Sequence, residues 1–223
     1  MKRNLAGIVV GLLCLLAFAI ITALVVSGVS QSADLHAALL VNGYYLGSSG
    51  TSLMVLVTSY GREVVWSLLV IVMFVAGSKR TKLLAVELAA LFIIGLLIGD
   101  FAKILVQRPR PDLASGIVLR VPAEPDPSYP SGHALIVSIG AAFALARFRR
   151  KTLAALLAVE AGLVCYSRVY VGVHYPLDVV GGVLLGIAIA LTGAVAVEKL
   201  LGSVLEKLLE PMMMVLKTGP LDV

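Results

Sequence analysis

Three short segments of this 223-residue chain combine basic, imidazole and carboxylate side chains between long apolar runs. The segments are residues 103–111 (KILVQRPRP), 130–133 (PSGH) and 167–178 (SRVYVGVHYPLD). Cations hold phosphate oxygens, and an imidazole can act as a nucleophile or as a general acid. Side chains of these types predict phosphoryl transfer, which needs in-line attack and stabilisation of charge on the equatorial phosphate oxygens.

The first segment offers two candidate phosphate ligands. Lys103 lies near the end of an apolar run, where an ionisable residue is costly and usually functional, although snorkelling to the headgroups is an alternative. Arg110 stands between Pro109 and Pro111, and the stiff backbone suits a guanidinium that must hold a fixed oxygen. Arg108 has a weaker claim to the phosphate, and for it a contact with the surface or with lipid headgroups is favoured.

The second segment predicts an anion site at the start of a helix. Ser131 and Gly132 follow Pro130 and precede an apolar run. A helix N-terminus presents unpaired N–H groups and a positive dipole end, and a glycine lets an oxyanion approach the backbone. An ordinary serine N-cap is the alternative. His133 favours the anion site, because it places an acid–base group beside it.

The third segment predicts a histidine oriented by a carboxylate. Pro176 suits the first position of a helix, so Asp178 would lie in the first turn and reach back to His174. A carboxylate on one ring nitrogen fixes the tautomer and leaves the other nitrogen free to attack. For a lone His–Asp pair the alternative is a structural hydrogen bond. Arg168 is a further candidate to hold the phosphate.

The rest of the sequence predicts the elements that position these residues. The chain is 60% hydrophobic and 14% charged, and its apolar runs are too long and uniform for barrel strands. We expect an all-α, polytopic membrane protein with about six transmembrane helices, including an uncleaved first helix. A short helix over Leu53–Thr58 could precede the second span. The expected spans are residues 5–28, 62–77, 82–105, 131–147, 152–168 and 176–198.

The net charge of +5 is explained by topology and lipid headgroups rather than by nucleic acid. The more basic set of connections, assigned to the cytoplasm with both termini, holds Lys2, Arg3, Lys79, Arg80, Lys82, Arg147, Arg149, Arg150, Lys151, Lys199, Lys207 and Lys217. The basic residues left on the other side need a different explanation, and they are Arg62, Lys103, Arg108, Arg110, Arg120 and Arg168. A single domain over 1–223 is expected, with residues 201–223 forming a helical tail on the cytoplasmic interface.

The residues outside the three segments offer little further chemistry. Cys14 and Cys165 lie in apolar runs and are interpreted as small hydrophobic side chains, not as a disulfide or a metal site. His36 lacks comparable neighbours and is expected on the surface. The tail's Met212–Met214 run is interpreted as packing at the membrane interface rather than as soft metal ligands.

The ordered motifs KxxxxxxRP, PSGH and SRxxxxxHxxxD closely resemble the type 2 phosphatidic acid phosphatase superfamily, over about residues 50–200. The three segments lie near the outer ends of the third to sixth predicted spans, so these helices could bring them together in one site. The resemblance implies a membrane-bound, metal-independent phosphatase without a cofactor. It implies that His174 forms a phosphohistidine, that Asp178 orients it and that His133 protonates the leaving oxygen. The implied phosphate ligands are Lys103, Arg110, Ser131, Gly132 and Arg168.

The expected substrate is a lipid phosphate held in the bilayer at the extracytoplasmic face of the cell membrane. A polyprenyl diphosphate such as undecaprenyl or dolichyl diphosphate is favoured, because carrier lipids for glycan export are left as diphosphates on that face. Phosphatidylglycerol phosphate, phosphatidic acid and phosphotransfer to another acceptor remain alternatives. Soluble vanadium haloperoxidases share the motifs, but the apolar spans count against them. A lipid-binding or lipid-moving protein is the alternative from another class, and the intact motifs argue against it. The oligomeric state stays open.

Overall fold

The computed structural model describes residues 2–197 and 223. Over this part the chain is helical and contains no strand. Its α-helices are α1 (Lys2–Val26), α2 (Gln31–Gly43), α3 (Gly47–Tyr60), α4 (Trp66–Ala76), α5 (Lys79–Val106), α6 (Gly132–Arg147), α7 (Lys151–Tyr170) and α8 (Pro176–Ala188). Three short helical segments complete the description: the π-helices η1 (Gly61–Val65) and η3 (Ile189–Gly193) and the 3₁₀ turn η2 (Leu113–Ser115).

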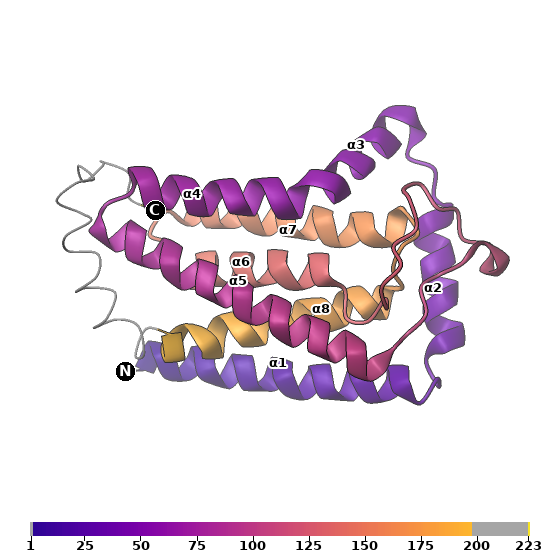
Figure 1. Ribbon diagram of the computed structural model, residues 1–223, viewed down its shortest axis with the longest axis horizontal. Helices are drawn as coiled ribbons and strands as arrows, with labels where there is room; N and C mark the ends of the chain where they lie inside the picture. The colour runs from indigo at the N-terminus through magenta and orange to yellow at the C-terminus, as the bar shows by residue number, and fades with distance from the viewer. Residues whose placement is uncertain (1, 198–222) are drawn as a thin grey trace.

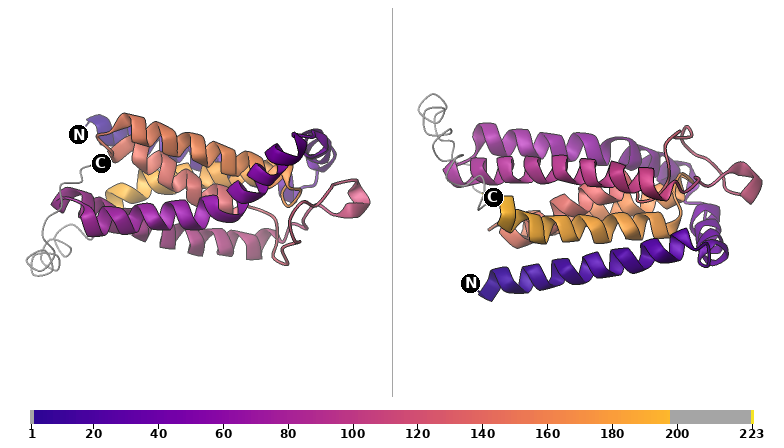
Figure 2. Two further views of the ribbon diagram at one scale, coloured as in Figure 1. Left: turned by 90° about the horizontal axis from the view of Figure 1, so that it is seen from above. Right: turned by 60° about the horizontal axis from the view of Figure 1, so that its bottom comes forward.

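The long helices run side by side, with α6 packed among α5, α7 and α8 (Figure 1). Helix α2 lies across one end of this bundle, and the other views show the same arrangement (Figure 2). The α4–α5 and α6–α7 connections and the start of α1 lie at the opposite end (Figure 1). The bundle therefore has one end with short basic connections and one end with α2 and the long 107–131 loop.

Five helical stretches are long and apolar enough to cross a membrane, which confirms a multi-pass membrane protein. They are Leu5–Val26, Gly47–Ala76, Lys79–Val106, Lys151–Tyr170 and Pro176–Val197. Helix α6 is a shorter apolar helix, and most of its side chains are buried by its neighbours. Because other helices surround α6, it need not match the bilayer thickness as a lipid-facing helix must. The predicted count of about six is right if α6 is included.

One predicted boundary is corrected, and one helix was not predicted. The second span starts at Gly47 rather than 62, since α3, η1 and α4 form one helical stretch that contains the short helix expected at Leu53–Thr58. The start of this helix was missed because serine and glycine there interrupt the apolar run. The helix packs against α7. Helix α2 was not predicted at all. The expected interfacial tail, including Met212–Met214, lies in 198–222, outside the described residues, apart from the terminal Val223.

Close packing of α6 against α8 brings two of the three motif segments together. Gly182 and Gly186 lie one turn apart on α8, and a Cβ at either would come within 2.5 Å of a carbonyl oxygen of Ser131 or Leu135. Small residues at this spacing let two membrane helices approach closely. The backbone N–H of Ser131 accordingly donates to the carbonyl of Asp178 at 2.9 Å.

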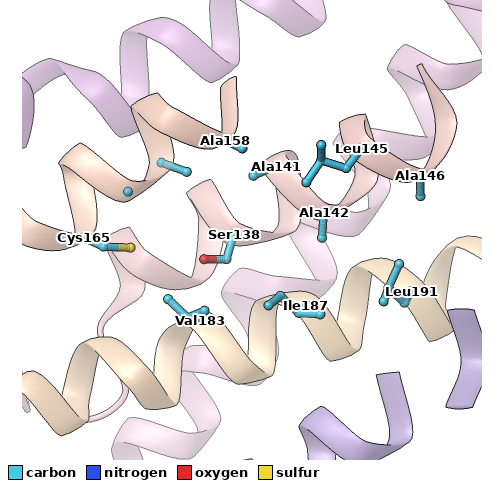
Figure 3. A pocket seen from close by; sticks show the side chains of 12 residues that line it. Ser138, Ala141, Ala142, Leu145, Ala146, Ala158, Cys165, Val183, Ile187 and Leu191 are labelled. Carbon is cyan, nitrogen blue, oxygen red and sulfur yellow. The ribbon is translucent and has the colours of Figure 1, made fainter. Parts of the chain in front are cut away.

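An apolar groove of about 620 Å³ lies between α6, α7 and α8 (Figure 3). Its lining is mainly alanine, leucine and other aliphatic side chains, with Ser138 and Cys165 as the exceptions. None of the predicted site residues lines it. Cys165 and Cys14 are both free and half-buried, as expected for small apolar side chains.

Candidate active site

His174 lies in the turn between α7 and α8, and only 1% of its surface is exposed. Its Nδ1 is 3.3 Å from Oδ2 of Asp178, and its Nε2 is 3.2 Å from an Nη of Arg110. Pro176 starts α8 as predicted, and Asp178 Oδ2 also accepts from the backbone N–H of Tyr175 at 2.9 Å. A carboxylate on Nδ1 favours the tautomer whose lone pair is on Nε2, the nitrogen that faces the basic residues.

Arg108 is buried in the site, so the prediction of a surface or headgroup contact was wrong. Its guanidinium donates to Asp178 Oδ1 at 2.6 Å and to Asp34 Oδ2 at 2.7 Å, and it stacks over the Tyr175 ring at 4.2 Å. Asp34 Oδ1 in turn accepts from the N–H of Leu177. In this arrangement the N–H groups of the buried arginine and the oxygens of the two carboxylates are hydrogen-bonded to each other. Asp34 was missed because it lies in the unpredicted helix α2.

Three predicted phosphate ligands converge near His174. Arg110 is fixed by its contact with the Val173 carbonyl at 2.9 Å. Arg168 is 2% exposed and donates to Thr58 Oγ1 at 2.8 Å, while its Nε has no partner in the part of the chain that is described. Lys103 lines the same cavity as His174. The cations therefore come from α5, the following loop and α7, as the motif spacing implied.

Two carboxylates that the sequence did not single out occupy these cations. Glu124 pairs with Arg110 at 2.7 Å and with Arg168, and Asp126 pairs with Arg110 at 2.7 Å and with Lys103. Although burial opposes ionisation, the charges of Arg168 and Arg110 keep the pKa of Glu124 below its ordinary value. Burial also raises the pKa of Asp126, but the hydrogen bond from Lys103 and the charge of Arg110 outweigh this effect and lower that pKa to about 2. Both carboxylates are therefore anionic at neutral pH. Their oxygens occupy positions on the cations that phosphate oxygens could take.

The start of α6 lines the cavity through Gly132 and His133. Ser131 occupies the N-cap position, yet its hydroxyl makes no capping hydrogen bond, and its buried Oγ is without a partner among the described residues. The ordinary N-cap alternative is therefore not observed. The cavity measures about 210 Å³. Its lining residues are Arg62, Lys103, Glu124, Asp126, Gly132, His133 and His174. The two histidines thus share one space.

The environment of His174 keeps its ring neutral. Burial, together with the positive charges of Arg168 and Arg110, holds the pKa of His174 well below its ordinary value. A neutral imidazole has a free lone pair, so the same cations that would bind phosphate also keep the nitrogen nucleophilic.

His36 and Ser167 do not line the cavity. His36 is exposed on α2, as predicted. Ser167 donates to the carbonyl of Val164, so its contact supports the last turns of α7.

Comparison with known proteins matches residues 81–201 to the model of the PAP2 superfamily. The chain belongs to this superfamily. The PAP2 match contains all three motif segments and starts at the beginning of α5, so Asp34, Thr58 and Arg62 are supplied by helices outside it.

Two relatives of the chain are described as undecaprenyl-diphosphatases. The chain is 44% identical to the undecaprenyl-diphosphatase of Sulfolobus acidocaldarius over 135 residues, 60% of this chain and 64% of that protein. It is 30% identical to the undecaprenyl-diphosphatase BcrC of Bacillus subtilis over 141 residues, 62% of this chain and 70% of that protein. The PAP2 chain thus spans just under two thirds of the first relative's length.

The fold agrees with a solved PAP2 structure. The PAP2-type phosphatidylglycerolphosphate phosphatase of Bacillus subtilis superimposes with a TM-score of 0.66 over 93% of this chain and 98% of that one. At 24% identity this likeness establishes the membrane-helical PAP2 fold and no more.

Proposed function

We propose that this protein hydrolyses a lipid diphosphate, and that a polyprenyl diphosphate is its substrate. The observation that carries the proposal is the geometry of His174, whose Nδ1 faces Asp178 while its Nε2 faces Arg110 in a cavity shared with His133. The relatives described as undecaprenyl-diphosphatases support the choice of lipid.

The reaction would proceed in two displacements. Nε2 of His174 attacks the terminal phosphorus, a P–N bond forms, and the bond to the bridging oxygen breaks. His133, which would have to carry a proton once the anionic diphosphate is bound, gives that proton to the bridging oxygen, so a lipid monophosphate leaves. Water, deprotonated by His133, then attacks the phosphohistidine and releases inorganic phosphate. Asp178 stabilises the ring of His174 as it becomes positively charged.

The charge of the transferring group would be stabilised by Lys103, Arg110 and Arg168. The unpartnered Ser131 Oγ and Arg168 Nε supply further donors, and α6 supplies N–H groups at Gly132. Such donors are already held in place by the fold, so they stabilise the developing charge without reorganising during the reaction. The substrate phosphate would have to displace Glu124 and Asp126 from the three cations.

We place the site on the extracytoplasmic side of the cell membrane, with both termini in the cytoplasm. The support is the separation along the bundle: the basic α4–α5 and α6–α7 connections lie at the end opposite to the site (Figure 1). Basic connections favour the cytoplasm. A carrier lipid in the outer leaflet would then reach the cavity from the membrane.

Phosphate release from a panel of lipid monophosphates and diphosphates in detergent tests this proposal. We expect a polyprenyl diphosphate to give the highest kcat/KM, with free phosphate as the product. Preference for phosphatidylglycerol phosphate or phosphatidic acid would shift the substrate to the alternative class. Label transferred from substrate to a second lipid, without free phosphate, would identify a phosphotransferase. Movement of lipid without any phosphate release would identify a lipid-moving protein.

A further inference from the structure

Arg62 is a basic residue of the cavity that belongs to none of the three motif segments. It lies in the π-helical segment η1 between α3 and α4, and outside the residues that match the family. Single π-helical turns within α-helices occur frequently at functional sites. Arg62 lies on the side of the bundle where the positive-inside rule favours few basic residues. Its charge therefore indicates a chemical role.

The packing of η1 fixes where Arg62 points. A Cβ at Gly61 would lie 2.5 Å from a methyl carbon of Val164 and 2.9 Å from a carboxylate oxygen of Glu160, so η1 touches α7 through a glycine. One turn later the indole N–H of Trp66 donates to Glu160 at 3.0 Å. These two contacts hold η1 against α7 and aim Arg62 at the cavity.

Within the cavity Arg62 lies beside the start of α6. A Cβ at Gly132 would be 3.7 Å from an Nη of Arg62, which places the guanidinium next to His133. Its ion-pair partner is the neighbouring Glu63, whose carboxylate is also 3.9 Å from Nε2 of His133. By their ion-pair partners the cations thus form two groups: Lys103, Arg110 and Arg168 pair with Glu124 and Asp126, and Arg62, beside the start of α6, pairs with Glu63.

In-line displacement places the attacking nitrogen and the leaving group on opposite sides of the reacting phosphorus. With His174 on one side of the reacting phosphorus, the leaving oxygen lies on the opposite side, next to its proton donor His133. In a lipid monophosphate that oxygen carries a carbon. In a lipid diphosphate it carries a second phosphate, which becomes more negative as the bond breaks. A guanidinium on the His133 side would meet that second phosphate.

We propose that Arg62 binds the phosphate that leaves with the lipid, so that it forms a second phosphate subsite which a lipid monophosphate leaves empty. The inference rests on the proposed function and adds to it the residue that holds the second phosphate of the substrate. When the subsite is filled, the second phosphate takes the place of Glu63 on the guanidinium. An arginine suits this role better than a lysine, because its guanidinium can bind two phosphate oxygens at once.

The test compares two substrates that share one lipid chain, farnesyl diphosphate and farnesyl monophosphate, in wild type, Arg62→Gln and Arg62→Lys. We expect Arg62→Gln to lower kcat/KM for the diphosphate about 10- to 100-fold and for the monophosphate less than about 3-fold. Arg62→Lys keeps the charge and should lose less. The ratio of the two substrates within one protein preparation does not depend on the amount of folded enzyme.

Arg120→Gln is the matched control. Arg120 lies on the same side of the bundle, donates to the carbonyls of Asn42 and Tyr170, and does not line the cavity, so its loss should leave the substrate ratio unchanged. Equal losses on both substrates in Arg62→Gln and in Arg62→Lys would overturn the subsite. If the wild type releases phosphate from neither substrate, the proposed function fails first and the subsite fails with it.

Discussion

An Nη atom of Arg108 lies 2.6 Å from Oδ1 of Asp178, and both side chains are buried. The other carboxylate oxygen of Asp178 faces His174 and the N–H of Tyr175. Arg108 therefore fixes the rotation of the carboxylate that orients the proposed nucleophile. Asp34 binds the second Nη of Arg108 and so ties α2 to this arrangement.

Arg108→Gln should lower kcat about 10- to 100-fold and change KM little, because Arg108 acts through Asp178 rather than on the substrate. Steady-state kinetics with a polyprenyl diphosphate measure the two parameters separately. Arg108→Lys should restore part of kcat, since an ammonium can still pair with one oxygen of Asp178. A rise in KM at unchanged kcat would instead make Arg108 a phosphate ligand.

Glu124→Gln should strengthen binding of orthovanadate, a phosphate mimic, by about 3- to 10-fold, because the anion no longer competes with a carboxylate for Arg110 and Arg168. The inhibition constant at pH 7 measures this. Since Glu124 has a lowered pKa, its carboxylate competes in the wild type at this pH. Asp112→Asn is the control, because Asp112 caps η2 and pairs with none of these cations. Weaker vanadate binding in Glu124→Gln would show that Glu124 organises the site instead.

The lowered pKa of His174 should make the protein less stable in weak acid. The unfolded chain takes up a proton on this ring below its ordinary pKa of about 6.5, while the folded protein does not, so stability falls as the pH drops below that value. His174→Gln removes this contribution. Melting temperatures in detergent between pH 7.5 and 5 should therefore fall less steeply in the variant. Parallel curves would mean that His174 is protonated in the folded protein.

Activity should persist in excess EDTA, because Lys103, Arg110 and Arg168 supply the positive charge that phosphoryl transfer needs. The measurement is initial-rate phosphate release before and after dialysis against the chelator. A loss that an added divalent ion reverses would refute the metal-independent mechanism.

The helices with long, uniform apolar runs could be predicted from the sequence, since transfer into the bilayer depends on composition over a window. The start of the second span could not. The stretch from Gly47 to Ser52 is polar, and its helical structure depends on packing against α7. Helix α2 was missed for a similar reason: it carries Asp34, His36 and Asn42 and lies across the end of the bundle rather than within it (Figure 1).

The motif residues were found because their spacing along the chain is informative, and His174 and Asp178 even share a helix start. The residues that pair with them were not found. Asp34 reaches Arg108 across 74 positions, and Glu124 reaches Arg168 across 44, so no local pattern connects them. Proline-rich loop sequence around Glu124 and Asp126 carries no periodic signal that would place it over a site.

Trapping the covalent intermediate tests the central role of His174 most directly. Polyprenyl diphosphate labelled in its terminal phosphate is mixed with the enzyme, quenched in alkaline detergent and digested, and the labelled peptide is sequenced by mass spectrometry. We predict phosphate on His174 in the wild type, with neither label nor turnover in a folded, membrane-inserted His174→Ala variant. Substantial phosphate release by that variant, or label on another residue, would contradict the account.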